Sequence, residues 1–178
     1  MSIDMQRIAV LVDNYFEQAE FEEPLQSLKA AGAAVTVVGT DTKELQSLRH
    51  VKKGEAFMAD ALIADAHPDE YDAIVLPGGV VNADHLRMNE MARDWVTHFT
   101  DEGKMVAAIC HAPWLLVSAD LVEGRRITSY YTLRDDIRNA GAEWIDQPVI
   151  LDGNLITSRQ PDDIPAFVEA IQEWFDHV

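Results

Sequence analysis

The sequence contains one cysteine, Cys110, among its 178 residues. A single cysteine cannot form an intramolecular disulfide, so nothing in the chain requires an oxidising compartment. It also excludes a metal site built from several cysteines. Basic residues are scarce as well, because 14 Lys and Arg stand against 31 Asp and Glu and give a formal net charge of −17. A chain this acidic repels nucleic acid and anionic membrane surfaces, and we expect neither as a partner.

Long apolar runs and targeting segments are also missing. No segment approaches the apolar length needed to span a bilayer, and the N-terminal MSIDMQRIAVLV has no export-type pattern. We therefore expect a cytoplasmic protein. The histidines other than His111 occur singly, without the spacing of metal ligands, so we expect no metal and no cofactor. The length predicts one domain over residues 1–178.

Short apolar segments alternate with helical patterns along the chain. Solid apolar runs such as RIAVLV (7–12) and YDAIVL (71–76) are typical of strands buried on both faces of a sheet. The alternation predicts an α/β protein, a three-layer sandwich in which a mostly parallel sheet carries helices on both faces. Further strands are expected at 33–38, 105–109, 126–129, 149–151 and 155–158, with a small hairpin around Gly54. Helices are expected at 17–31, 83–100, 113–119, 132–140 and 162–178, with a kink or restart at Pro24 and an end at Gly32.

Cys110 stands where a predicted strand meets a predicted helix. Alanines lie two residues before it and two after it, in Ala108-Ile-Cys-His-Ala112. Nucleophile elbows of hydrolases have small residues at the same two positions, because larger side chains would collide with neighbouring strands. A thiol at a helix N-terminus also favours the thiolate. From this pattern two interpretations stay open, a nucleophile and an inert buried cysteine.

Backbone donors are expected close to this thiol. Ligand sites in open α/β sheets lie beyond the carboxyl ends of the strands, where the loops converge. The N–H of His111, directly after the thiol, is where an oxyanion donor is expected. The Gly78-Gly79 pair at the end of a neighbouring strand either supplies a second N–H or forms an ordinary tight turn.

With these residues in view, the chain resembles the ThiJ/PfpI superfamily, in its PfpI-type stress-protein branch. The resemblance covers nearly everything from Arg7 to the C-terminus. It implies the flavodoxin-like, three-layer fold of class I glutamine amidotransferase domains. The motifs that carry it are Phe16-Glu17 with Glu20 and Pro24, Ala73-Ile-Val-Leu-Pro-Gly-Gly79, Ala108-Ile-Cys-His-Ala-Pro113, Thr128-Ser-Tyr130, Asp135-Asp136, Asn139-Ala-Gly141-Ala-Glu-Trp144 and Asp152-Gly-Asn154.

The resemblance also implies roles for individual residues. Cys110 matches the reactive, easily oxidised cysteine of the family. Glu17 matches a protonated glutamate that contacts the sulfur and donates a hydrogen bond to the thiolate. His111 matches the histidine of a proposed Cys-His-acid triad, and it is either a working base or mainly the supplier of a backbone N–H. Gly79 and the His111 backbone match the oxyanion pocket, and Tyr130 matches a tyrosine near the site.

The third member of that triad is less well defined by the resemblance. In PfpI peptidases it is a glutamate from a neighbouring subunit, in the loop after Pro-Gly-Gly. The best candidate here is Asp84, although the loop length differs and Asp is shorter than Glu. A carboxylate near the start of a helix that complements the helix dipole is the competing interpretation. If Asp84 acts in trans, the active form is a homodimer or a higher homo-oligomer.

Three functions are compatible with these residues. The first is a deglycase or glyoxalase-like hydrolase, in which the thiolate attacks a carbonyl or hemiaminal carbon of a small carbonyl adduct. The second is an intracellular cysteine peptidase or amidase that is active as an oligomer. The third is a redox sensor or holdase chaperone whose cysteine oxidises to a sulfinate. All three use one site around Cys110, and we expect the first.

Overall fold

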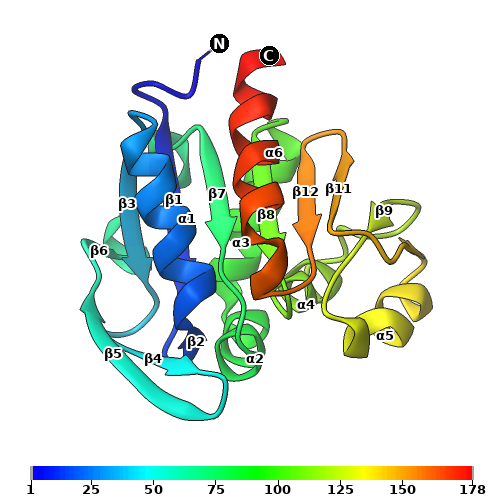
Figure 1. Cartoon of the computed structure of the whole chain (residues 1–178), viewed down its shortest axis with the longest axis horizontal. Helices are drawn as coiled ribbons and strands as arrows, with labels where there is room; N and C mark the ends of the chain where they lie inside the picture. The colour runs from blue at the N-terminus through cyan, green and yellow to red at the C-terminus, as the bar shows by residue number, and fades with distance from the viewer. Residues whose placement is uncertain (1, 178) are drawn as a thin grey trace.

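The computed structural model describes residues 2–177 as a three-layer α/β sandwich (Figure 1). A seven-stranded sheet forms the middle layer, with the strand order β11-β12-β8-β7-β1-β3-β6. Neighbouring strands run parallel except at the β11-β12 edge. The mostly parallel sheet predicted from the sequence is therefore confirmed. Its strands are β1 (Arg7–Val12), β3 (Ala34–Gly39), β6 (Ala61–Leu62), β7 (Ala73–Leu76), β8 (Met105–Ile109), β11 (Val149–Asp152) and β12 (Leu155–Ser158).

The central strands are buried because helices cover both sides of them. Every residue of β7 and β8 is buried, as is every residue of β1 except Arg7. Alternate side chains of β1 enter two separate cores, so that Leu11 packs on one face and Val10 on the other. The continuous apolar runs in the sequence follow directly from this two-sided burial.

Helices α1 (Gln18–Ala30) and α6 (Ile164–His177) pack together on one face of the sheet, in front of it in Figure 1. The other face is covered by α2 (Val80–Met88), α3 (Glu90–Asp101), α4 (Pro113–Ser118) and α5 (Arg134–Asn139). Short 3₁₀ helices occupy Ile63–Asp65, Pro68–Glu70, Tyr131–Leu133 and Pro161–Asp163. Within the described residues, no helix combines the length and the apolarity that crossing a membrane requires.

Two smaller sheets flank the central one. The hairpin predicted around Gly54 is confirmed as β4 (Glu44–Arg49) and β5 (Lys52–Met58), and β2 (Phe16–Glu17) pairs with β4. The strand predicted at 126–129 is shorter, because β9 (Arg126–Ile127) pairs only with β10 (Glu143–Trp144), outside the central sheet. Beyond Ile127 the chain turns away, and the Tyr130 N–H donates to the carbonyl of Cys110 at 2.8 Å.

Three helix predictions differ from the structure. The single helix expected over 83–100 is two helices, because Asn89 is extended and its side chain accepts a hydrogen bond from the Ala92 N–H at 3.1 Å. Helix α1 continues through Pro24 without a restart. The last predicted helix, 162–178, begins at Ile164 after a 3₁₀ turn, and its final residue, Val178, lies outside the described residues.

The parallel strands place four loops at one edge of the sheet. The loops after β1, β7, β8 and β12 all follow the carboxyl ends of their strands, and the strand arrows of β7, β8 and β12 point toward that lower edge in Figure 1. This is the edge where open α/β sheets bind ligands. The fold therefore gathers Gly78-Gly79, Cys110 and Gln160 in one region.

The Asn89 cap is a testable element of this fold. Asn89→Ala removes the side-chain acceptor for the Ala92 N–H, so we expect it to lower the free energy of unfolding by about 1 kcal/mol. Urea denaturation followed by circular dichroism measures the change. The control, Asp94→Ala, alters an exposed residue of the same helix and should change stability by less than about 0.5 kcal/mol. Equal effects of the two variants would show that the cap does not stabilise the break between α2 and α3.

Candidate active site

Cys110 lies at the junction of β8 and α4, as the sequence predicts, with its backbone in the left-handed region. Its φ is 64°, a conformation that a non-glycine residue adopts at a cost. Hydrogen bonds from the Cys110 N–H to the Ser158 carbonyl, at 3.0 Å, and from the Tyr130 N–H to the Cys110 carbonyl hold it there. The side chain is buried but lines a pocket. This geometry is that of a nucleophile elbow.

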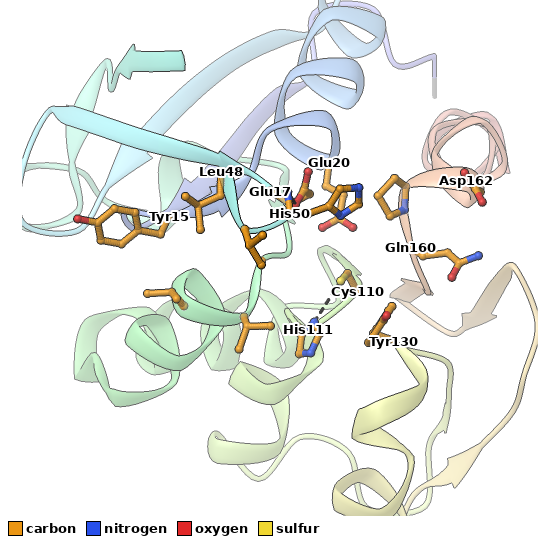
Figure 2. A pocket seen from close by; sticks show the side chains of 15 residues that line it. Tyr15, Glu17, Glu20, Leu48, His50, Cys110, His111, Tyr130, Gln160 and Asp162 are labelled. Atoms are coloured by element: carbon orange, nitrogen blue, oxygen red, sulfur yellow. Dashed lines mark hydrogen bonds between the residues drawn. The ribbon is translucent and has the colours of Figure 1, made fainter. Parts of the chain in front are cut away.

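The carboxyl group beside the sulfur belongs to Glu20, in the first turn of α1 (Figure 2). Glu20 is fully buried, and neither of its oxygens has a hydrogen-bond partner of good geometry. The Cys110 sulfur and the Gly78 backbone lie close enough to affect its ionisation. Burial above all, with a smaller contribution from the charge of Glu17, raises the pKa of Glu20 from 4.5 to about 8. Glu20 is therefore protonated at neutral pH and can donate a hydrogen bond to a neighbouring anion.

This finding corrects the expectation that Glu17 contacts the sulfur. Glu17 ends β2, directly before α1, and its carboxylate accepts a hydrogen bond from the His50 N–H at 2.9 Å. It lines the same pocket as Cys110. Both glutamates stand in the motif that carries the resemblance, but only Glu20 lies on the buried face of α1. The spacing of Glu20, Pro24 and Leu28, each four residues apart, is the sequence signal that identifies this face.

Burial also controls the ionisation of the sulfur. It raises the pKa of the Cys110 thiol well above its ordinary value, and a charged Glu20 raises it further. The backbone N–H groups of Gly79 and His111 hydrogen-bond to the sulfur and lower its pKa. Because Glu20 is itself neutral at neutral pH, the repulsion it would exert as a carboxylate is removed. With Glu20 neutral, the two backbone N–H groups are the contacts that favour the thiolate against the cost of burial.

The imidazole of His111 contacts the sulfur directly. Its Nδ1 lies 3.2 Å from Cys110 Sγ, and its Nε2 lies 3.3 Å from the Thr132 hydroxyl. The ring stacks on Tyr130 with the ring centroids 4.9 Å apart. Burial lowers the pKa of His111 from 6.5 to about 4, so the ring is neutral at neutral pH. A neutral imidazole in this place can accept a proton from the thiol.

The Pro-Gly-Gly turn reaches the site because it has no side chains at its two glycines. A Cβ at Gly78 would lie 2.6 Å from the Cβ of Cys110 and would collide with the Glu20 carboxyl. Gly79 has a φ of 95°, and a Cβ there would lie 2.7 Å from the Glu17 nitrogen. The backbone can therefore approach the sulfur closely, as an oxyanion pocket requires.

A pocket of about 830 Å³ opens over the sulfur (Figure 2). Its walls come from the β1, β7, β8 and β12 loops and from the tip of the β4-β5 hairpin. The lining includes carboxylates at the rim but no lysine or arginine. The lining residues are Tyr15, Glu17, Glu20, Leu48, His50, Val51, Gly79, Val80, Val81, Cys110, His111, Tyr130, Gln160, Pro161 and Asp162.

Asp84 does not join this group within the chain. It is exposed on α2 and does not line the pocket, and Thr132 is the side chain beside His111 Nε2. An acid contributed from a neighbouring subunit therefore stays a prediction. Sequence reasoning did not identify His50, Gln160 and Thr132 as site residues. His50 and Gln160 stand in turns without a motif, and Thr132 lies in the 3₁₀ helix Tyr131–Leu133, where nothing in the sequence singles it out. In residues 2–177 no group of three or more His, Cys, Asp or Glu side chains is placed to hold a metal ion.

The pH dependence of folding tests the buried state of Glu20. Above a pH of about 4.5 the unfolded chain releases this proton while the folded chain keeps it up to about pH 8, so Glu20 lowers stability increasingly over that range. Glu20→Gln removes this penalty. We expect its stability advantage over wild type to grow by more than about 1 kcal/mol between about pH 5 and about pH 8.

Urea denaturation at several pH values makes this measurement. Glu23→Gln, at an exposed position of the same helix, is the control and should follow the wild-type curve. A constant difference between Glu20→Gln and wild type across the range would contradict a carboxyl that stays protonated in the folded protein.

Known proteins are similar to this chain along most of its length. Residues 6–173 match the model of the DJ-1/PfpI family. The protein/nucleic acid deglycase 2 of Escherichia coli is 42% identical over 90% of this chain and 92% of its own length. The deglycase PfpI of Pyrococcus furiosus is 40% identical over 91% of this chain and 95% of its own.

A solved structure shows the same fold. A two-domain protein of Anabaena variabilis, with DJ-1/ThiJ/PfpI-like and ferritin-like domains, superposes with a TM-score of 0.89 at 35% identity. The superposition covers 96% of this chain and 50% of that longer protein.

Proposed function

The chain belongs to the DJ-1/PfpI family, and we propose that it is a cysteine-dependent deglycase that removes small carbonyl adducts through Cys110. The observation that carries the proposal is the contact of the Cys110 sulfur with His111 and with a protonated Glu20 in one pocket. The deglycase names of relatives that match about nine-tenths of the chain support it. A cytoplasmic role in carbonyl or oxidative stress is part of the same proposal.

In the proposed reaction the Cys110 sulfur is the nucleophile. At a carbonyl carbon the S–C bond forms as the C=O electron pair moves to oxygen, and the N–H groups of Gly79 and His111 stabilise that oxyanion. At a hemiaminal carbon the S–C bond forms as the C–N bond breaks. The leaving nitrogen takes up the thiol proton, which the neutral imidazole of His111 transfers. The carbon bound to sulfur still carries its hydroxyl group. As the imidazole of His111 accepts the hydroxyl proton, the C=O bond re-forms and the S–C bond breaks, which regenerates the thiolate and frees the carbonyl compound.

The charge of the pocket lining favours one class of substrate. Its lining carries Glu17 and Asp162 and no lysine or arginine, so it favours neutral or positively charged adducts over anionic ones. Adducts on lysine and arginine side chains of proteins have this charge. Tyr130 stands on the wall beside His111, where its ring can pack against the aliphatic part of such a substrate.

Removal of the sulfur tests the proposal. We expect Cys110→Ala to lower the rate of release of methylglyoxal from N-acetyl-lysine at least about 100-fold, because the covalent route is lost. The free amine is quantified by chromatography. His67→Asn, a change at an exposed histidine outside the pocket, should keep the wild-type rate. A Cys110→Ala protein that turns over as fast as wild type would exclude cysteine chemistry.

An oligomeric peptidase or amidase is the second candidate. Three valines at the pocket rim are solvent-exposed in the single chain, with Val51 93%, Val80 52% and Val81 36% exposed. Apolar side chains exposed together favour contact with another protein surface, and a second copy of the chain is the partner we propose. In such an assembly Asp84 of one subunit would approach His111 of another. Oxidation of Cys110 to a sulfinate stabilised by Glu20 would serve a redox sensor or holdase with the same residues.

The state of assembly tests the second candidate. If Asp84 completes a triad in trans, Asp84→Asn should keep the oligomer seen by light scattering and lower amidase activity about tenfold or more, because His111 loses its acid. Asp94→Asn, at an exposed site on α3, is the matched control. A monomer that retains full activity would contradict catalysis by a shared site.

A further inference from the structure

Asn82 is a fully buried amide at the start of α2, and all three of its hydrogen bonds are to the backbone. Its Nδ2 donates to the carbonyls of Pro77 and Gly78, both at 3.0 Å. Its Oδ1 accepts from the Asp13 N–H at 2.7 Å. Carbonyl groups cannot donate and an N–H cannot accept, so these partners fix the orientation of the amide. Asn82 therefore joins the end of β1 to the Pro-Gly-Gly turn.

One of these contacts acts on the peptide unit that faces the sulfur. The Gly78 carbonyl and the Gly79 N–H belong to the same planar peptide, so whatever holds the carbonyl also sets the direction of the N–H. The carbonyl accepts from Asn82 and from the Glu17 N–H, the latter at 3.2 Å. On the opposite side, the Gly79 N–H hydrogen-bonds to the Cys110 sulfur. Donors on the carbonyl also polarise this N–H and strengthen it as a donor.

The two glycines make such a restraint necessary. A Cβ at Gly78 would collide with Cys110 and the Glu20 carboxyl, and a Cβ at Gly79 would collide with the backbone of residues 15–17, so neither position can carry a side chain. Without side chains the peptide between Gly78 and Gly79 has an unusually wide choice of orientations. The restraint must then come from outside the turn, and Asn82 and the Glu17 backbone are the groups that supply it.

We propose that Asn82 is a positioning residue that holds the Gly78–Gly79 peptide with its N–H directed at Cys110, and so keeps the sulfur reactive as an anion. The proposal rests on the proposed function only in taking Cys110 as the reactive group. Asn82 touches neither the sulfur nor the pocket, and its effect passes through the backbone. If Asn82 had a purely structural role, it would only join β1 to α2, and its loss would change stability but not the reactivity of Cys110.

Asn82→Asp is the decisive variant, because it keeps the shape of the side chain and the acceptor for the Asp13 N–H. It replaces the donor to the two carbonyls with an oxygen, which repels them and releases the peptide. The probe is iodoacetamide, whose reaction with the single cysteine is followed by intact mass across a range of pH. Losing an N–H donor to the thiolate raises the pKa of the thiol and lowers the thiolate fraction.

We expect alkylation near neutral pH to slow about three- to tenfold, and the pH midpoint of the reaction to move up by about one unit. The rate falls by less than the thiolate fraction does, because a more basic thiolate is also a stronger nucleophile. Asn82→Ala removes the same donor without adding an acceptor, and it should shift the midpoint in the same direction. This second variant keeps the test decisive where Asn82→Asp does not fold.

Asn154→Asp is the matched control. The Nδ2 of Asn154 also donates to a backbone carbonyl, that of Lys104 at 2.8 Å, but it lies in the β11-β12 turn beside the start of β8, at the opposite edge of the sheet. We expect a smaller loss of stability than in Asn82→Asp, because Asn154 is half-buried and Asn82 is fully buried, and a wild-type alkylation profile. If folded Asn82 variants alkylate like wild type, or if Asn154→Asp shifts the midpoint equally, the proposal is overturned.

The alkylation experiment and the test of the proposed function can fail independently of each other. Alkylation requires no enzyme substrate, so a wild-type protein without deglycase activity still tests the position of the N–H. Conversely, a deglycase whose Asn82 variants keep the wild-type midpoint would leave the proposed function standing and remove the role of Asn82.

Discussion

Removal of water from one carboxyl group governs the chemistry of this protein. Glu20 is fully buried against the Cys110 sulfur and the Gly78 backbone, and a carboxylate there would be left without adequate partners. Burial therefore keeps the proton on Glu20 at neutral pH. Burial also raises the pKa of the sulfur beside it, and the backbone donors of Gly79 and His111 offset part of that effect. The neutral carboxyl and the two donors together make a thiolate less costly at this buried position than burial alone would allow.

The parallel sheet explains how this pair is assembled. β1, β7, β8 and β12 end at one edge, and each loop there contributes a different kind of group. The β8 loop supplies the sulfur and the imidazole, and the β7 loop supplies a backbone donor. Helix α1 supplies the Glu20 carboxyl group from its first turn. Each group is held by backbone hydrogen bonds or by burial, so the arrangement depends little on flexible side chains.

The sequence was sufficient for the parts of the fold that depend on periodicity. The apolar runs at 7–12, 71–76 and 105–109 identified the central strands, and small residues on both sides of Cys110 identified the elbow. It was insufficient where a contact joins residues distant in the chain. Glu17 and Glu20 are both acidic residues of one motif. The four-residue spacing of Glu20, Pro24 and Leu28 marks the buried face of α1, but only the packing of α1 against the Pro-Gly-Gly turn shows that this face meets the sulfur. The break at Asn89 was missed for a different reason, because it depends on a local side-chain cap, from the Ala92 N–H to the Asn89 side chain, and apolar periodicity carries no signal for such a cap.

The β4-β5 hairpin covers the pocket but belongs to a sheet of its own, apart from the strands that carry the nucleophile. Its tip, at His50 and Val51, is exposed, and the Glu17 carboxylate accepts a hydrogen bond from the His50 N–H. The tip forms one wall of the entrance, whereas Cys110 and His111 follow a strand of the central sheet. One wall of the pocket and the groups that touch the sulfur therefore rest on different sheets, which meet where β2 pairs with β4 and where His50 contacts Glu17.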